Sequence, residues 1–221
     1  MDAGLSFDRA ETRPNLRGHS VFLSASIPDP VRWEGRADPL EITDAVVALA
    51  RVCLSAGMRL ITAAHPTIAP LLSYVAAELP SELEAQVAIY QSMLFEDVLP
   101  PATRRFETDG VAQVIWTEAV EGDRPEPGHW DPSLAVMRNQ MLSETEPSGA
   151  VFIGGMDGIQ VEYELFQGLC PGRPTYPIAY PGGEAELIAR EMSDPPVPDL
   201  LNGRVYPTVW NRVLEDLESR R

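Results

Sequence analysis

Lysine is absent from the 221 residues, and all 17 basic residues are arginine. A Walker A phosphate loop and a Schiff-base enzyme both depend on a lysine, so both kinds of site are excluded. Positive charge is scarce altogether, because 33 acidic residues give a formal net charge of −16. A surface of that charge repels duplex nucleic acid and anionic membranes, and we expect neither as a partner. Local groups must therefore hold any anionic ligand against the field of the whole protein.

Cysteines and long apolar runs are also few. Cys53 and Cys170 stand alone without metal-ligand spacing, which predicts buried thiols rather than a metal site. No apolar run approaches the roughly 20 residues that a membrane helix needs. The acidic start of the chain lacks the basic and apolar regions of a signal peptide. We therefore expect a cytoplasmic protein with neither a metal nor a resident cofactor.

Short apolar segments alternate with helical patterns along most of the chain. The predicted strands are Ser20–Ser24, Met58–Thr62, Ala85–Gln91, Gln113–Thr117, the run that begins at Gly149, and Thr175–Ile178. The predicted helices are Glu41–Ala56, Ile68–Leu79, Asp131–Ser143, one beginning near Gly158, Gly183–Met192 and Thr208–Leu217, with a short helix and a turn expected within 92–110. Such alternation is typical of an α/β fold, here a single doubly wound domain with a mainly parallel sheet. We expect residues 1–19 to be an irregular lead-in and residues 20–221 to form the domain.

Ligands of a doubly wound sheet bind outside the carboxyl ends of the strands, near the point where the strand order reverses. Small polar residues, an imidazole and glycines follow the predicted strands at this edge. They are Ser24, Ser26, His65, Thr67, Gln91, Ser92, Thr117, Gly154, Gly155 and Gly158. Together they predict a polar, phosphate-binding rim, although each residue alone also fits a turn, a cap or a loop contact.

The stretch from Gly149 to Phe166 predicts a buried strand, a tight turn and a helix N-terminus. Glycines permit positive φ and close approach of a ligand, and the first turn of a helix attracts an anion such as phosphate. Glu162 and Glu164 on that helix would place carboxylates beside the phosphate. The glycine spacing differs from Gly-x-Gly-x-x-Gly and follows the fifth predicted strand, which disfavours a nicotinamide dehydrogenase.

Arg138 lies between the inward-facing Met137 and Met141 of a predicted helix. An arginine beside an apolar stripe either extends to solvent or turns towards a buried carboxylate or phosphate. Pairing with Glu162 is geometrically reasonable because both residues belong to the same rim. No nucleophile, base and orienting group occur together, and the three histidines lie far apart in the sequence.

Taken together, these residues resemble the SLOG superfamily, which includes the LOG-type phosphoribohydrolases, DprA-like proteins and ligand-sensing domains. The segments that carry the resemblance are Val21–Ser26, Ala63–Pro66, Ser133–Arg138 and Gly154–Tyr163, within residues 20–192. The resemblance is strongest to the branch associated with TIR domains in prokaryotic conflict systems. It implies a Rossmann-like fold in which Gly154, Gly155 and Gly158 contact phosphate, and in which Glu162 meets ribose or acts as a catalytic acid. It also implies a homodimer or higher homo-oligomer and a TIR-domain protein as a partner.

The LOG enzymes carry Pro-Gly-Gly-x-Gly-Thr-x-Glu-Glu at this loop, and the sequence departs from that motif. Ile153 replaces the proline, Ile159 replaces the threonine, and Glu162 lacks an adjacent second glutamate. These departures favour nucleotide binding over hydrolysis.

Three functions remain open from the sequence. One is a sensor that binds a nucleotide-derived signal of the ADP-ribose or nucleoside-phosphate type in a bacterial defence system. Another is a LOG-like phosphoribohydrolase, with Glu162 and Arg138 as catalytic residues, that cleaves the N-glycosidic bond of nucleoside monophosphates. The third is an interaction protein whose crevice has lost its ligand. The apolar tail Val205–Trp210 fits either an oligomer contact or a cover for the core.

Overall fold

A computed structural model describes residues 16–63, 65–78, 86–99, 101–108, 112–126 and 128–220. These residues form a six-stranded sheet of order β4-β3-β2-β1-β5-β6, in which all neighbouring strands pair in parallel. The strands are β1 (Ser20–Ser26), β2 (Arg59–Thr62), β3 (Val87–Ser92), β4 (Gln113–Thr117), β5 (Gly149–Gly154) and β6 (Thr175–Ile178). The predicted α/β fold, Rossmann-like and doubly wound, is confirmed.

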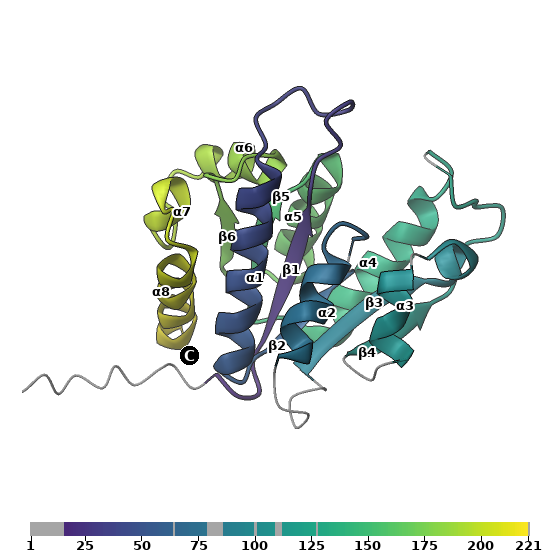
Figure 1. Ribbon diagram of the computed structural model, residues 1–221, viewed down its shortest axis with the longest axis horizontal. Coiled ribbons are helices and arrows are strands. Elements are labelled where there is room, and N and C mark those ends of the chain that lie inside the picture. Colours follow the sequence, from purple (N-terminus) through teal and green to yellow (C-terminus); the bar gives the residue numbers. More distant parts are fainter. Residues whose placement is uncertain are drawn as a thin grey trace, which may run out of the picture.

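Helices cover both faces of the sheet (Figure 1). The first layer contains α1 (Pro39–Ser55), α2 (Ala69–Ala77), α3 (Pro101–Thr108) and α8 (Tyr206–Ser219), and the second contains α4 (Asp131–Thr145), α5 (Asp157–Leu169) and α6 (Glu184–Glu191). Two short elements complete the described chain: the 3-10 helix η2 (Met93–Val98) and α7 (Asp199–Asn202). The short helix expected within 92–110 is therefore the pair η2 and α3, whereas α7 was not predicted. The predicted limits at Leu79 and Ala85 and most of the lead-in lie outside the described residues.

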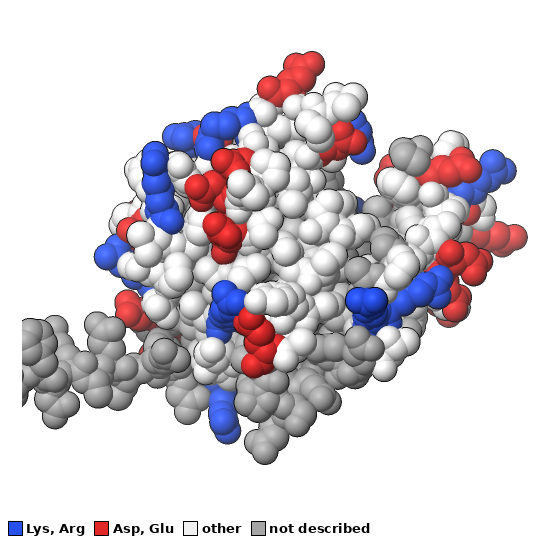
Figure 2. Space-filling view, viewed as in Figure 1, with Lys and Arg blue, Asp and Glu red and all other residues white. Residues whose placement is uncertain are grey.

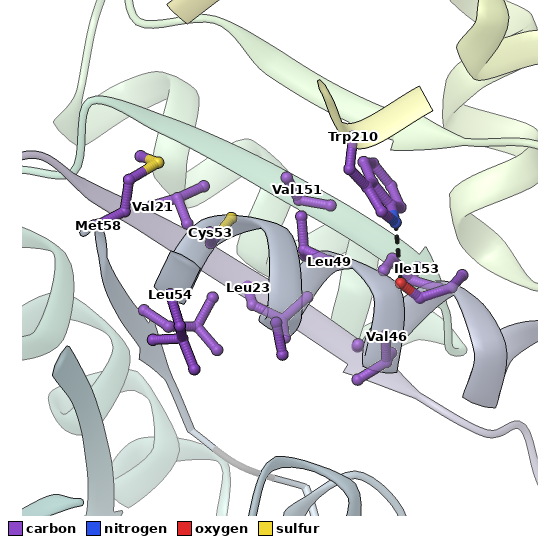
Figure 3. Packing of buried hydrophobic residues seen from close by; sticks show 14 of the residues in the cluster. Val21, Leu23, Val46, Leu49, Cys53, Leu54, Met58, Val151, Ile153 and Trp210 are labelled. Atoms are coloured by element: carbon purple, nitrogen blue, oxygen red, sulfur yellow. Dashed lines mark hydrogen bonds between the residues drawn. The ribbon is translucent and has the colours of Figure 1, made fainter. Parts of the chain in front are cut away.

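The apolar tail covers the core. Helix α1 begins where the Asp38 side chain accepts hydrogen bonds from the N–H groups of its first turn, and Pro39 favours that start. Helix α8 packs against α1, and the fully buried Trp210 donates from Nε1 to the Ala45 carbonyl oxygen at 2.9 Å (Figure 3). Val205, the first residue of this segment, remains 65% exposed. Of the two roles open for this segment, closing the core is the one that the structure shows.

The chain path places the reversal of strand order at the end of β1. Strand β1 lies between β2 and β5. The chain leaves β1 for α1 on one face and leaves β5 for α5 on the other (Figure 1). The carboxyl ends of β1 and β5 therefore flank the reversal of strand order at which such sheets bind ligands. Among the described helices, none combines the length and the apolar character of a membrane span.

Candidate functional site

The loop after β5 holds its two glycines in the left-handed region of backbone conformation. Gly154 has φ of 65° and Gly155 has φ of 71°. The Gly155 N–H donates to the Ser26 carbonyl oxygen at 2.7 Å, which fastens the loop to the end of β1. A Cβ on Gly155 would lie 2.0 Å from Cγ1 of Ile159, the first buried side chain of α5. Both the conformation and the packing therefore require glycine at Gly155.

A second glycine pair, which the sequence analysis missed, supports the first. Gly182 and Gly183 follow β6 with φ of 86° and 76°. A Cβ on Gly183 would lie 2.4 Å from the carbonyl carbon of Gly154, and the Glu184 N–H donates to the Gly155 carbonyl oxygen at 2.9 Å. The loop between β5 and α5 is thus held between the ends of β1 and β6.

These contacts determine which amides can face an anion. The Gly155 N–H is already used within the protein, so it is not a donor for phosphate. The N–H groups of Asp157 and Gly158 belong to the first turn of α5, where no carbonyl within the helix is available to them. No side chain caps this helix. The anion-binding donors of the loop are therefore the first amides of α5, which include Gly158.

Three elements bring Ser24, Arg138 and Glu162 together. Glu162 on α5 accepts from Arg138 Nε at 2.9 Å through one carboxylate oxygen and from Ser24 Oγ at 2.5 Å through the other. Only 16% of the Arg138 side chain and 12% of the Glu162 side chain are exposed. A Cβ on Gly158 would lie 3.4 Å from Arg138 Nη2, so the helix start and the guanidinium are neighbours. Of the two orientations considered for Arg138, the structure has the one directed at Glu162.

Glu164 does not belong to this cluster. Its side chain is exposed and accepts a hydrogen bond from Gln160 Nε2 at 2.7 Å. Two residues along a helix turn a side chain to a different face, which explains why Glu162 and Glu164 diverge. The expectation that both carboxylates stand beside the phosphate is wrong for Glu164, and Glu162 is the carboxylate of the cluster.

His65 and Thr67 follow β2 at the same rim, and both are exposed. The Thr67 hydroxyl accepts from the Ile27 N–H at 3.0 Å and lies 2.9 Å from His65 Nδ1. These contacts connect the loop after β2 to the loop after β1. Loss of hydration lowers the pKa of His65, and the Glu162 carboxylate opposes that shift. The lowered pKa favours the neutral imidazole.

Within the described parts of the chain, no three or more histidine, cysteine, aspartate or glutamate side chains are grouped so that they could hold a metal ion. Cys53 and Cys170 are buried as predicted, and burial raises the pKa of Cys53 to about 12.

The chain matches the family model described as the SLOG cluster3 family over residues 32–214. No curated protein sequence matches it. Among solved structures, the chain is similar to the X-ray structure of TM1055, a target of the Northeast Structural Genomics Consortium. That alignment has 16% sequence identity and a TM-score of 0.49, and it covers 78% of this chain and 81% of TM1055. Since the family match spans most of its length, the chain belongs to the SLOG cluster3 family and is a nucleotide-related Rossmann-like domain.

Proposed function

We propose that the rim binds a nucleotide-derived ligand through its ribose and an adjacent phosphate, and that the protein is a sensor of this ligand. The observation that carries the proposal is the position of Glu162. Arg138 and Ser24 hold its carboxylate in place. Glu162 itself belongs to α5, the helix whose N-terminal amides lie at the rim. A carboxylate oxygen has more than one lone pair, so Glu162 can accept from a ribose hydroxyl while keeping both partners.

The anion is held by local groups, as the charge of −16 requires. The first amides of α5 and the positive end of its dipole attract phosphate. The Arg138 guanidinium has donors beyond the Nε that it uses on Glu162, and Gly158 leaves room beside it. Figure 2 shows the surface hollowed in the upper right of the view, between α5 and the start of α4 as placed in Figure 1.

Binding without turnover fits this geometry better than hydrolysis. Cleavage of an N-glycosidic bond needs a group that protonates the leaving base as well as a carboxylate that stabilises the developing positive charge. Glu162 can provide the second role, but Glu164 faces away and the lowered pKa of His65 favours its neutral form, so neither supplies the proton for the leaving base. A LOG-like phosphoribohydrolase remains the second candidate, since Glu162 can stabilise the positive charge that develops on the ribose.

Titration with AMP and with ADP-ribose, followed by calorimetry and by chromatography of any released base, separates the two candidates. We expect binding without base release, and we expect Glu162→Gln to weaken binding at least about tenfold, because a neutral amide accepts a ribose hydroxyl less strongly than a carboxylate does. Base release by the wild-type protein that is lost in Glu162→Gln would establish the hydrolase. No binding of either compound to the folded protein would overturn the proposal and favour an interaction protein.

Gly158→Ala tests the phosphate end of the site. Gly158 has an ordinary φ and its nearest contact from a new Cβ is 3.4 Å, so the folded protein accommodates alanine. Alanine also favours a helix over glycine, by up to about 1 kcal/mol. We expect an unchanged or higher melting temperature together with weaker binding of ribose 5-phosphate, since the methyl group occupies the space beside Arg138. Unchanged affinity would show that the anion does not approach this turn.

A sensor must pass its ligand-bound state to another molecule. We extend the proposal to a cytoplasmic homo-oligomer that acts with a TIR-domain protein in bacterial defence, on the strength of the family resemblance. The exposed Val161, Leu169 and Leu187 on α5 and α6 are available for such contacts.

A further inference from the structure

An enclosed space lies at the same edge of the sheet, farther along the strand order and on the opposite face, where α3 packs. It is a cavity of about 120 Å³ between the ends of β3 and β4 on one side and η2 and α3 on the other. Its walls include Gln91, Leu99, Thr103, Arg104, Val114 and Trp116. None of these residues belongs to the cluster around Glu162.

A polar group in the wall lacks a partner. Thr103 is 3% exposed, and within the described structure its Oγ1 has no hydrogen-bond partner. A buried hydroxyl without a partner destabilises the folded state, so its presence calls for an occupant that completes the hydrogen bond. Gln91 is 7% exposed and donates from Nε2 to the Ala63 carbonyl oxygen at 2.5 Å, which holds its carboxamide at the cavity.

The remaining wall combines apolar and aromatic side chains with the charged Glu96 and Arg104. Val114 and Trp116 point to one face of β4 because they are two residues apart, and Leu99 also lines the cavity. Arg104 is held in place by its hydrogen bond to the Glu96 carbonyl oxygen. An indole ring in a wall that also carries hydroxyl and carboxamide groups matches a planar heterocycle with a polar edge, which is the chemistry of a nucleobase.

The volume of the cavity and its distance from β5 limit which part of a ligand can bind there. The volume of 120 Å³ is several times that needed for one water molecule but is below the roughly 300 Å³ of a complete small-molecule site. Three strand spacings separate β5 from β3, which amounts to about 14 Å, and a ligand that joins the two sites also crosses the carboxyl edge of the sheet from one face to the other. That distance exceeds the separation of phosphate and base in a nucleoside monophosphate.

We propose that this cavity, the Thr103–Trp116 cavity, is the base subsite of a diphosphate-linked ligand whose other end, a ribose and its phosphate, occupies the site at Glu162 and the start of α5. The inference rests on the proposed function, which it makes more specific. The ligand is then a nucleoside diphosphate derivative with a ribose beyond the second phosphate, and a nucleoside monophosphate fills only half of the rim.

Three probes separate the two ends of the rim: ribose 5-phosphate for the Glu162 end, adenosine for the Thr103–Trp116 cavity, and ADP-ribose for both. We expect Trp116→Ala to weaken the binding of ADP-ribose at least about tenfold, because stacking of a base on an aromatic ring is lost. Trp116→Phe should retain most of the affinity. Ribose 5-phosphate should bind wild type and both variants equally.

Thr103→Val removes the unpartnered hydroxyl while keeping the shape of the side chain. We expect its melting temperature to rise by about 2 °C or more and its affinity for ADP-ribose and adenosine to fall. A merely structural threonine would change stability without changing adenosine affinity. A folded variant of higher stability also excludes misfolding as the cause of lost binding.

The outcomes distinguish this inference from the proposed function. ADP-ribose binding that is unchanged in Trp116→Ala and Thr103→Val overturns the base subsite and leaves the Glu162 site intact. If adenosine binds and its binding depends on Trp116 while ribose 5-phosphate does not bind, the base subsite is supported and the proposed site at Glu162 is overturned. Absence of binding by all three probes overturns both.

Discussion

Gly183→Ala should lower the melting temperature by about 6 °C or more. At φ of 76°, an alanine occupies the left-handed region at a cost of about 1–2 kcal/mol. Its Cβ would also lie 2.4 Å from the carbonyl carbon of Gly154, which is backbone and cannot rotate away. The two glycine loops must then separate, and the total loss is about 3 kcal/mol or more, at roughly 2–4 °C for each kcal/mol in a chain of this size. Thermal unfolding followed by circular dichroism measures the change.

Gly172→Ala is the matched control, because Gly172 has the same backbone conformation as Gly183 but lacks a close contact such as that between Gly183 and Gly154. Gly172 has φ of 79°, and a new Cβ there would meet nothing within 4 Å. We expect a loss of about 1–2 kcal/mol from backbone strain alone. If both variants melt at the same temperature, the contact between Gly183 and Gly154 does not stabilise the rim. The prediction would then be wrong even if each variant is destabilised.

The fold was predictable from the sequence because each buried strand is a short run bounded by breakers. Gln113–Thr117 agrees residue for residue, and the parallel order follows from the helices between strands. The pairing of Arg138 with Glu162 was also within reach, since both positions map to the rim once the sheet is assumed. Local pattern and topology decide these features.

The remaining features depend on contacts that no local pattern encodes. The glycine pair at Gly182 matters because β6 and β5 are neighbours, which brings Gly183 against Gly154. Thr67 was expected to contact a ligand, yet its hydroxyl accepts from the Ile27 N–H, 40 residues away, and lies beside His65. Whether Thr67 also reaches a ligand stays a prediction. The cavity at Thr103 required the packing of α3 against β4, which the weak pattern within 92–110 could not indicate.

Arg138→Ala should weaken ligand binding and also destabilise the protein. Affinity for ADP-ribose should fall at least tenfold, or about 1.4 kcal/mol, because Arg138 lies beside the phosphate donors and orients Glu162. The substitution also leaves Glu162, with only 12% of its side chain exposed, dependent on the Ser24 hydroxyl alone. Loss of one partner of a fully buried ion pair costs about 3–5 kcal/mol. The partial exposure of this pair reduces the expected loss to about 1–3 kcal/mol.

Two comparisons separate the ion pair from other effects of Arg138→Ala. The double variant Arg138→Ala with Glu162→Ala should be less destabilised than the sum of the single variants, because no unpaired carboxylate remains. Arg51→Ala removes an exposed arginine near the C-terminal end of α1, where it pairs with Glu78. It should cost less than about 1 kcal/mol and leave ADP-ribose affinity unchanged. Additive single effects, or equal losses in Arg51→Ala and Arg138→Ala, would show that the charge pair does not organise the site. Glu162 would then need its positioning from Ser24 and from the start of α5.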